Sequence, residues 1–378
     1  MRVIIEALGI NTYGGGRTAT INLIKGLLSI YPQHKYLLIL SEPEPELHGV
    51  CARQLVVPIS NRFISRVWLQ MTLPFLSKHY DIIHFTKNLG VFGLRIPYIV
   101  TIYDLAVLLY PELFPVIDVI YWKYLQKITL KNAHRIISIS YQTAQDLQFF
   151  YAIPARKIEV IYPICGQHFR VAMPQELIRV KSIYHLPDYY ILYVGRIDPR
   201  KNITTLIEAF SIFLKHTNFP GKLIIIGKQY KKKPDYKIYE LINKLNIQEK
   251  VQMIESVPDA DLPGIYTGAT MAVFPSIYEG FGLAALEALS CGTPLIVNRA
   301  GGIVEVVGES ALIMNNNHPE HLAELMFLLW KDTSLRSTLR SSGLIQASKF
   351  SLEQSVIKTM NLYLEVCENN ENHQKVQK

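Results

Sequence analysis

Residues 272–297 read AVFPSIYEGFGLAALEALSCGTPLIV, and this stretch decides the fold. An apolar strand over 272–274 leads into a turn with Glu279 and two glycines, then into a short helix with Glu287, and a second apolar strand follows at 295–297. A strand that opens through a glycine turn into a helix points backbone N–H groups and the positive end of the helix dipole at one place. We expect a phosphate to bind there. A carboxylate beside a phosphate is not there for charge attraction, so we interpret Glu279 and Glu287 as hydrogen-bond acceptors for sugar hydroxyls.

The same alternation of strand and helix runs through the whole chain. Short apolar runs separated by helical patterns are typical of a parallel sheet that helices cover on both faces. The runs that we interpret as buried strands are 2–5, 36–40, 82–85, 98–101 and 135–138, and then 190–194, 222–226, 251–254, 271–274, 295–297 and 311–314. They predict an α/β protein with two doubly wound, Rossmann-like parallel sheets in tandem, each of which offers ligands the carboxyl ends of its strands.

The composition indicates a folded protein of a reducing compartment. Hydrophobic residues make up 49% of the 378-residue chain and charged residues 19%, which is enough for two cores and excludes a disordered chain. The four cysteines are scattered, without metal-site spacing or a disulfide framework. The N-terminus reads as a strand rather than a signal peptide, and the longest uncharged stretch, 262–278, is broken by prolines and glycines. We therefore expect a cytoplasmic protein with no transmembrane helix.

The positive charge is concentrated in the first half of the chain. Residues 1–165 hold 16 Lys and Arg against 10 Asp and Glu, whereas the remainder holds 23 against 21. Such a surplus suits an anionic partner such as a membrane surface, a lipid-phosphate acceptor or nucleic acid, although a basic soluble protein has the same charge balance.

A predicted helix over 61–78 bears on this question. Five apolar residues follow helical spacing, namely Ile64, Val67, Trp68, Met71 and Phe75, and basic residues stand at both ends. The pattern fits a helix that lies on an anionic membrane, but a core-facing helix more often has this pattern, and we favour the core-facing interpretation.

Two loops carry further candidate binding residues. The first contains Gly14-Gly15-Gly16 and matches the dinucleotide fingerprint G-x-G-x-x-A, but several residues separate it from its strand, so the match is weak. The glycines could also serve only to form a tight turn. The second loop follows the strand at 190–194 and contains Gly195, Arg196 and Lys201. An arginine fork and a lysine point charge together suit a diphosphate.

With these motifs in order, the chain resembles a retaining glycosyltransferase of family 4, glycosyl transferases group 1. The most specific element is E-x7-E, here Glu279 to Glu287. Supporting motifs follow in the family's order: Gly14-Gly15-Gly16, Asp81-Ile-Ile-His84, Thr101-Ile-Tyr103-Asp104, Ser138-Ile-Ser140, Val194-Gly195-Arg196 with Lys201-Asn202, and Val257-Pro258-Asp259. The resemblance covers nearly the whole chain. It implies the GT-B fold, in which two Rossmann-like domains face each other across a cleft.

The resemblance also implies which domain binds each substrate and which residues take part. Residues 1–167 would form the acceptor-binding domain, residues 168–352 the domain for the nucleotide sugar, and residues 353–378 a helix that packs back towards the first domain and ends in a frayed tail. The implied catalytic residues are Arg196, Lys201 and Glu279. The implied donor-binding residues are Gly15, Gly16, Gly195, Ser256, Val257, Phe281, Gly282, Leu283 and Glu287, and Tyr103 and Asp104 would lie on the acceptor or sugar side.

The reaction implied by the resemblance is transfer of a hexose, with mannose as the first choice, from a nucleotide-diphosphate sugar to a glycan or lipid-linked acceptor. The product would be a cell-surface polysaccharide or glycolipid. We expect no cofactor, no metal and no nucleic-acid partner, and a cytoplasmic enzyme, peripheral at the inner face of the cell membrane. Arg196 and Lys201 would stabilise the departing diphosphate, with front-face attack on the sugar.

One departure from the family pattern keeps other functions open. Tyr103 stands where family members commonly have a histidine, and a tyrosine is no proton shuttle near neutral pH. A catalytically silent, glycan-binding or scaffolding relative is therefore an alternative. A less favoured alternative is a nicotinamide oxidoreductase that uses the glycine loop, but it explains neither Arg196 and Lys201 nor the two glutamates.

Overall fold

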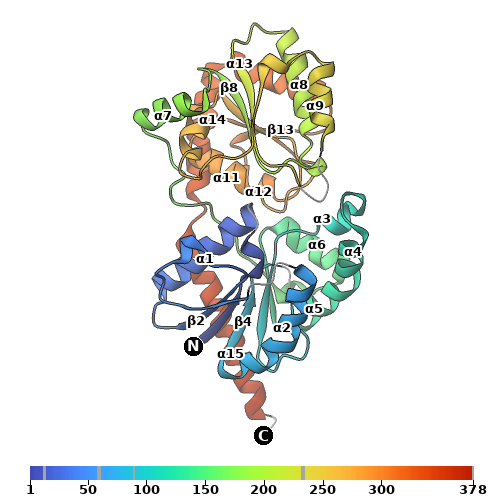
Figure 1. Ribbon diagram of the computed structural model, residues 1–378, viewed down its shortest axis with the longest axis vertical. Coiled ribbons are helices and arrows are strands. Elements are labelled where there is room, and N and C mark those ends of the chain that lie inside the picture. Colours follow the sequence, from blue (N-terminus) through green and yellow to red (C-terminus); the bar gives the residue numbers. More distant parts are fainter. Residues whose placement is uncertain (12–13, 58–60, 88–89, 231–234, 377–378) are drawn as a thin grey trace. The chain divides into compact units, whose positions relative to one another are not determined.

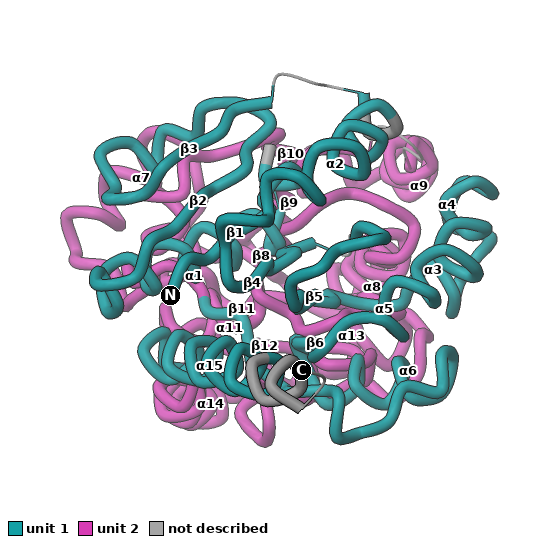
Figure 2. Tube along the Cα trace, turned by 90° about the horizontal axis from the view of Figure 1, so that it is seen from below, with its two compact units in different colours: residues 1–164, 351–378 teal, residues 165–350 magenta. Residues whose placement is uncertain are grey.

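The computed structural model describes residues 1–11, 14–57, 61–87, 90–230 and 235–376. Residues 12 and 13 of the predicted glycine loop, and residues 377–378 of the predicted frayed tail, lie outside the described residues. The chain forms two compact units (Figure 1), and Figure 2 colours them separately. Unit 1 comprises residues 1–164 and 351–378, and unit 2 comprises residues 165–350.

Unit 1 is built on a parallel sheet of seven strands in the order β3-β2-β1-β4-β5-β6-β7. The strands are β1 (Arg2–Glu6), β2 (Lys35–Leu40), β3 (Arg53–Val56), β4 (Ile82–Phe85), β5 (Tyr98–Ile102), β6 (Arg135–Ser138) and β7 (Ile158–Val160). The five strands predicted for this part are confirmed. The sequence missed β3 and β7, which are the two edges of the sheet. Edge strands are short and half-exposed, so they lack the apolar run that reveals a central strand.

Helices cover both faces of this sheet. On one face α1 (Gly15–Ile30) and α15 (Leu352–Val376) share a core with Val3 and Ile5 of β1. On the other face α2 (Arg62–Leu76), α5 (Lys127–Asn132) and α6 (Tyr141–Tyr151) pack over β4 and β5. Alternate residues of β1 divide between the two cores because successive side chains of a strand point to opposite faces.

The C-terminal helix α15 belongs to unit 1 although unit 2 precedes it in the chain. It lies against α1, and its buried residues Val356, Met360 and Tyr363 join the α1 core. The Tyr363 hydroxyl also lies 2.6 Å from Nδ1 of the buried His84 in β4. The helix extends to Val376, through most of the segment for which the sequence predicts a frayed tail.

The helix at 61–78 packs on the core, as favoured, but through a different set of residues from the predicted one. In α2, Leu69 and Leu73 are buried in the core. Four of the residues expected to face the core are exposed instead, with fractions of 53% for Ile64, 47% for Val67, 67% for Met71 and 67% for Phe75. The helix has two apolar stripes, and spacing alone does not say which of them meets the sheet.

Unit 2 is built on a second parallel sheet, of six strands in the order β10-β9-β8-β11-β12-β13. Its strands are β8 (Tyr190–Val194), β9 (Lys222–Ile226), β10 (Val251–Ile254), β11 (Met271–Phe274), β12 (Leu295–Asn298) and β13 (Ala311–Met314), and all six are as predicted. The main helices are α7 (Pro174–Tyr184), α8 (Ile203–Lys215), α9 (Lys237–Lys244), α10 (Leu262–Gly268), α11 (Leu283–Ser290), α12 (Ile303–Val307), α13 (Pro319–Lys331) and α14 (Thr333–Ser348).

The strand order of unit 2 places its ligand site. From β8 the chain moves outward to β9 and β10, and it then returns to β11 on the other side of β8. The strands β8 and β11 are neighbours, and the loops that leave their carboxyl ends therefore run in opposite directions. Such a reversal of direction is where doubly wound sheets bind ligands.

Candidate functional site

The two loops at this reversal point supply an ion pair between two of the predicted catalytic residues. Lys201 ends the short helix η7 (Pro199–Lys201) after β8, and Glu279 lies in the turn after β11. The Lys201 Nζ donates to Glu279 Oε1, and the two side chains are only 17% and 13% exposed. The two residues are 78 positions apart in sequence, and they meet because β8 and β11 are neighbouring strands.

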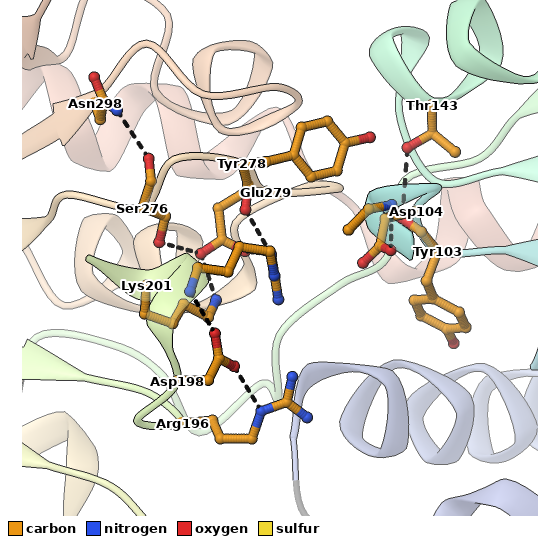
Figure 3. A network of polar contacts seen from close by, with 12 residues as sticks. Tyr103, Asp104, Thr143, Arg196, Asp198, Lys201, Ser276, Tyr278, Glu279 and Asn298 are labelled. Atoms are coloured by element: carbon orange, nitrogen blue, oxygen red, sulfur yellow. Dashed lines mark hydrogen bonds and ion pairs between the residues drawn. The ribbon is translucent and has the colours of Figure 1, made fainter. Parts of the chain in front are cut away.

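Neighbouring groups complete a polar network around Glu279 (Figure 3). The Ser276 hydroxyl donates to Glu279 Oε1 at 2.7 Å. The Arg200 guanidinium lies 3.6 Å from Glu279 Oε2 and donates to the Tyr278 carbonyl at 2.5 Å. Glu279 is thus held by two cations and a hydroxyl.

This environment sets the charge states of the pair. Burial by itself would raise the pKa of Glu279, but Lys201, Arg200 and the hydrogen bond from Ser276 outweigh burial and lower the pKa to about 2. Burial lowers the pKa of the Lys201 ammonium, and the attraction of Glu279 partly offsets this effect. Glu279 is therefore a firmly ionised carboxylate, with little tendency to accept a proton.

Local backbone features fix the two loops. The Asp198 carboxylate accepts from the Arg200 N–H at 3.0 Å and caps η7. The Ile277 N–H donates to the Arg200 carbonyl at 2.9 Å, so the two loops are joined by backbone as well as by side chains. Glu279 also forms a parallel bridge with Gly301, where a Cβ would lie 2.3 Å from the Glu279 carbonyl oxygen. Only glycine allows this approach, and its φ of 67° also favours glycine.

The turn after Glu279 opens into α11 as the sequence predicts. Gly282 takes φ 99° at the N-cap, where a Cβ would meet Ile303 at 2.7 Å. Phe281 is buried with its ring against that of Phe350, at a centroid distance of 5.7 Å. Leu283 begins the helix. From the sequence we expect an anion to bind at the backbone N–H groups of this first turn, where the positive end of the helix dipole lies.

Glu287, the second glutamate of the E-x7-E element, lies on α11 in a different environment. Its Oε2 accepts from the Tyr266 hydroxyl at 3.1 Å. Burial raises the pKa of Glu287 to about 8, and the negative charge of Asp259 acts in the same direction. Its carboxyl group is therefore largely protonated at neutral pH, and it can then donate a hydrogen bond as well as accept one.

Arg196 is more accessible than the ion pair. Its side chain is 44% exposed, its Nε donates to Asp198 at 2.9 Å, and its guanidinium lies 4.2 Å from the centroid of the Tyr230 ring. Gly195 precedes it directly at the end of β8. Of the two residues predicted to meet the base, Ser256 is exposed and Val257 is half-buried, in the loop after β10.

In unit 1, Tyr103 and the glycine turn are in contact. Gly15 and Gly16 form the first turn of α1. The Tyr103 hydroxyl donates to the Gly16 carbonyl at 3.2 Å and lies 3.1 Å from the Thr20 hydroxyl. Burial raises the pKa of Tyr103 to about 12. Asp104 accepts from the Ala106 N–H at 3.1 Å.

Sequence reasoning missed several members of these networks. Arg200 and Asp198 lie in the same loop as Arg196 and Lys201. They are only 8% and 4% exposed, which distinguishes them from ordinary surface charges. The chain also holds an Asp-x-Asp triplet at 259–261, a pattern that could hold a metal ion. In the structure Asp261 accepts from Arg179 and Tyr184, so both of its oxygens have donors.

Two family profiles match the chain. "Glycosyl transferases group 1" matches residues 174–344, and "Glycosyltransferase Family 4" matches residues 13–164. The "O-antigen chain mannosyltransferase B" of Escherichia coli is 30% identical over 266 residues, which cover 70% of this chain and 69% of that protein. The chain belongs to glycosyltransferase family 4. It is a glycosyltransferase, so the nicotinamide oxidoreductase alternative has no support.

Other relatives of this glycosyltransferase share less of their length with it. The "O-antigen chain mannosyltransferase RfbU" of Salmonella typhimurium is 28% identical over 57% of this chain and 56% of its own length. The "Serotype-specific mannosyltransferase WbdA" of Escherichia coli is also 28% identical, but only 28% of its own length is covered.

Solved structures show the fold. Anabaena Alr3699/HepE, determined in complex with UDP and glucose, has a TM-score of 0.80 and 18% identity, and the match covers 97% of this chain and 100% of that one. WaaG, a glycosyltransferase involved in lipopolysaccharide biosynthesis, has a TM-score of 0.75 and 14% identity, with 96% and 99% covered. The two parallel-sheet units together have the GT-B fold, as predicted.

Proposed function

We propose that this glycosyltransferase transfers a hexose, with mannose as the first choice, from a nucleotide-diphosphate sugar to a glycan or lipid-linked acceptor, with retention of anomeric configuration. The observation that carries the proposal is the buried Lys201–Glu279 pair, with Arg200 and Arg196 beside it, at the carboxyl ends of β8 and β11. The printed names of relatives, which are mannosyltransferases of O-antigen synthesis, support mannose and a role in cell-surface polysaccharide synthesis.

The charges of the site suit a departing nucleoside diphosphate. Negative charge develops on the terminal phosphate as the sugar leaves, and fixed cations stabilise it. Arg196 has an accessible planar fork and Lys201 a point charge, while the N-terminus of α11 adds backbone N–H groups. These groups provide the stabilisation from the protein alone, which supports a metal-independent reaction.

The state of Glu279 supports front-face attack rather than double displacement. A covalent intermediate requires a carboxylate that attacks the anomeric carbon. Glu279 has a pKa of about 2 and is bound to Lys201 and Ser276, so it is a weak nucleophile. In our proposal Glu279 holds Lys201 and accepts a sugar hydroxyl, Glu287 binds the ribose, and the leaving phosphate takes the proton of the acceptor.

Ligand-induced thermal shift tests the donor assignment. The panel contains GDP, UDP, ADP, GDP-mannose, UDP-glucose and NADH. A nucleotide that binds only the folded state adds about 2.7 kcal/mol at 100 times its Kd. We expect GDP and GDP-mannose to raise the melting temperature of the wild type, and Arg196→Ala to reduce the shift. A melting temperature that rises with NADH and with no other ligand of the panel would contradict the proposal.

A reaction assay completes the test. With the donor identified, product analysis by NMR should show the anomeric configuration of the donor, and a chelator should leave the rate unchanged. An inverted product contradicts retention, and loss of activity with the chelator contradicts the metal-free step. Binding of the nucleotide sugar without any transfer or hydrolysis would favour the silent, glycan-binding alternative, for which the Tyr103 substitution is the specific observation.

A further inference from the structure

A cavity in unit 1 has a lining that is rich in hydroxyl groups. Its volume is about 40 Å³, and it lies beside the first two turns of α1 and α15, at the carboxyl ends of β4 to β7. Hydroxyl-bearing side chains of both helices and of the sheet line it, among them Thr20, Thr86, Thr101, Ser355 and Thr359. None of the described residues in its lining is charged. We call this space the hydroxyl cavity.

The hydroxyl groups present acceptors to the cavity, because their protons are already used. Thr20 and Thr86 each donate to a backbone carbonyl at 2.8 Å. Ser355 and Thr359 do the same at 2.9 and 2.8 Å. A hydroxyl group has one proton and two lone pairs, so an oxygen that donates to the backbone can only accept a hydrogen bond from a ligand. The cavity therefore favours a neutral ligand that brings hydrogen-bond donors.

Two tyrosine rings stand at the same edge of the sheet. Tyr162, which lines the cavity, follows β7, and Tyr141 is the first residue of α6, which follows β6. The two rings form an edge-to-face pair with a centroid distance of 6.3 Å, and Tyr141 is 61% exposed. A tyrosine ring has an apolar body and a negative face, which attracts the C–H groups on one side of a pyranose ring.

Hydrogen bonds to the backbone hold both tyrosines in place. Ser140 caps α6 by accepting from the Thr143 N–H at 3.0 Å. The Thr143 hydroxyl donates in turn to the Tyr103 carbonyl at 3.4 Å (Figure 3). On the other side, the carbonyl of Tyr162 is held by Ser355 of α15. Rings that are positioned in advance lose less entropy when a ligand binds.

From this combination we infer that the hydroxyl cavity and the Tyr141–Tyr162 pair bind a pyranose ring of the acceptor, through its hydroxyl groups and its C–H face. The inference rests on the proposed function and adds which part of the acceptor unit 1 recognises. The cavity has room for about three water-sized groups, which is enough for a hydroxymethyl group and a neighbouring hydroxyl.

The chemistry of the cavity favours a sugar ring over a lipid phosphate. An ionised phosphate brings no hydrogen-bond donor and binds best to cations, whereas the cavity offers lone pairs and no charge. A free glycan and a lipid-linked glycan both present a pyranose ring, so they share the chemistry that is recognised. The described part of the chain has no helix that is long and apolar enough to cross a membrane.

Saturation-transfer NMR on the full-length protein tests the inference. The probes are the methyl glycosides of mannose, glucose, galactose and N-acetylglucosamine, with farnesyl phosphate as the anionic lipid probe. We expect at least one glycoside to bind, with the strongest transfer to the C–H protons on one face of its ring. Replacing its hydroxyls by fluorine one at a time should weaken binding roughly 5-fold or more at one position at least, because fluorine cannot donate to the cavity oxygens.

Variants locate the binding site. Tyr141→Ala should weaken glycoside binding roughly 10-fold, whereas Tyr141→Trp keeps a ring face and should bind like the wild type. Thr359→Val keeps the shape, removes an acceptor and should weaken binding roughly 5-fold. The matched control is Phe149→Ala, because Phe149 is 82% exposed on the same helix but lies about 12 Å further along it. This control should bind like the wild type.

Each result supports or overturns the inference. It is overturned if no glycoside binds, if only farnesyl phosphate binds, if every fluorinated analogue binds like its parent, or if Tyr141→Ala and Phe149→Ala weaken binding equally. The same sugar linked to farnesyl phosphate distinguishes the two sources: tighter binding than the methyl glycoside indicates a lipid-linked acceptor and equal binding a free glycan, and both results support recognition of the ring.

The donor site provides an independent readout. Tyr141→Ala should retain the nucleotide-induced thermal shift of the wild type, which also shows that the variant is folded. That shift depends on the donor site of unit 2, so failure of the acceptor inference and failure of the proposed function can be distinguished.

Discussion

Glu279 and Glu287 are the same residue type, stand eight positions apart on one turn and helix, and have opposite acid–base behaviour. Glu279 faces Lys201, Arg200 and Ser276, and its pKa is lowered to about 2. Glu287 faces the Tyr266 hydroxyl without a neighbouring cation, and desolvation raises its pKa to about 8. Both are half-buried, so the difference comes from whether cations accompany the carboxylate.

The two charge states suit the two glutamates of the E-x7-E element to different tasks. A carboxylate with two cations can anchor Lys201 permanently, whereas a neutral carboxyl group can exchange donor and acceptor roles with a hydroxyl. The contrast also has opposite consequences for stability. For Glu279, the stabilisation is present above the unfolded-state pKa near 4.5 and is lost as the pH falls towards about 2. For Glu287, stability is greatest below about 4.5 and declines as the pH rises to about 8.

The largest expected effect follows the change Glu279→Gln, which removes the charge and keeps the shape. Lys201 is then left buried without its partner, which costs about 3 kcal/mol of unfolding free energy. Sugar transfer should fall by roughly 100-fold or more because the diphosphate side loses a positioned cation. Calorimetry and a transfer assay measure the two effects.

The exposed Glu249 provides the matched control. Glu249→Gln should change neither stability nor transfer. If Glu279→Gln behaves the same way, the ion pair has no role.

The double variant Glu279→Gln/Lys201→Met sharpens the comparison. Removing both charges avoids the uncompensated ammonium, so much of the stability lost in Glu279→Gln should return, while transfer stays low. Urea unfolding of the two single variants and the double variant gives the coupling energy. A double variant as unstable as the sum of the singles would contradict a direct interaction.

Glu287→Gln should change stability by an amount that depends on pH. Glutamine resembles the protonated carboxyl group, so stability near pH 5 should be close to that of the wild type. Between about pH 4.5 and 8 the wild type should lose stability relative to the variant, by up to about 1.4 kcal/mol per pH unit. Thermal unfolding across this range measures it. Parallel curves for the two proteins would show that Glu287 does not titrate as described.

The smallest effect is expected from Tyr266→Phe. The Tyr266 hydroxyl stabilises the charged form of Glu287, so its removal should raise the pKa of Glu287 further and cost about 1 kcal/mol of stability. NMR titration of the glutamate carboxyl carbons measures the pKa. A lowered pKa in this variant would mean that the Tyr266 contact has been assigned the wrong effect.

The sequence predicted most of the fold and only part of the site. Central strands are continuous apolar runs, so the eleven predicted strands are all present, whereas the half-exposed edges β3 and β7 gave no such signal. The E-x7-E element and Arg196 with Lys201 were visible because they lie at the ends of recognisable strands. Arg200 and Ser276 were not, because their importance comes from burial and from the contacts that they make with Tyr278 and Glu279.

By itself the sequence determined the alternation of strand and helix, the family, and the residues that carry charge at the strand ends. These features depend on local spacing and residue type. The tertiary structure decided which stripe of α2 meets the sheet, that Lys201 pairs with Glu279, and that two equivalent glutamates hold different charges. Each of these three features depends on which groups from other parts of the chain surround a side chain. Strand order and packing fix that environment, and spacing along the chain does not record it.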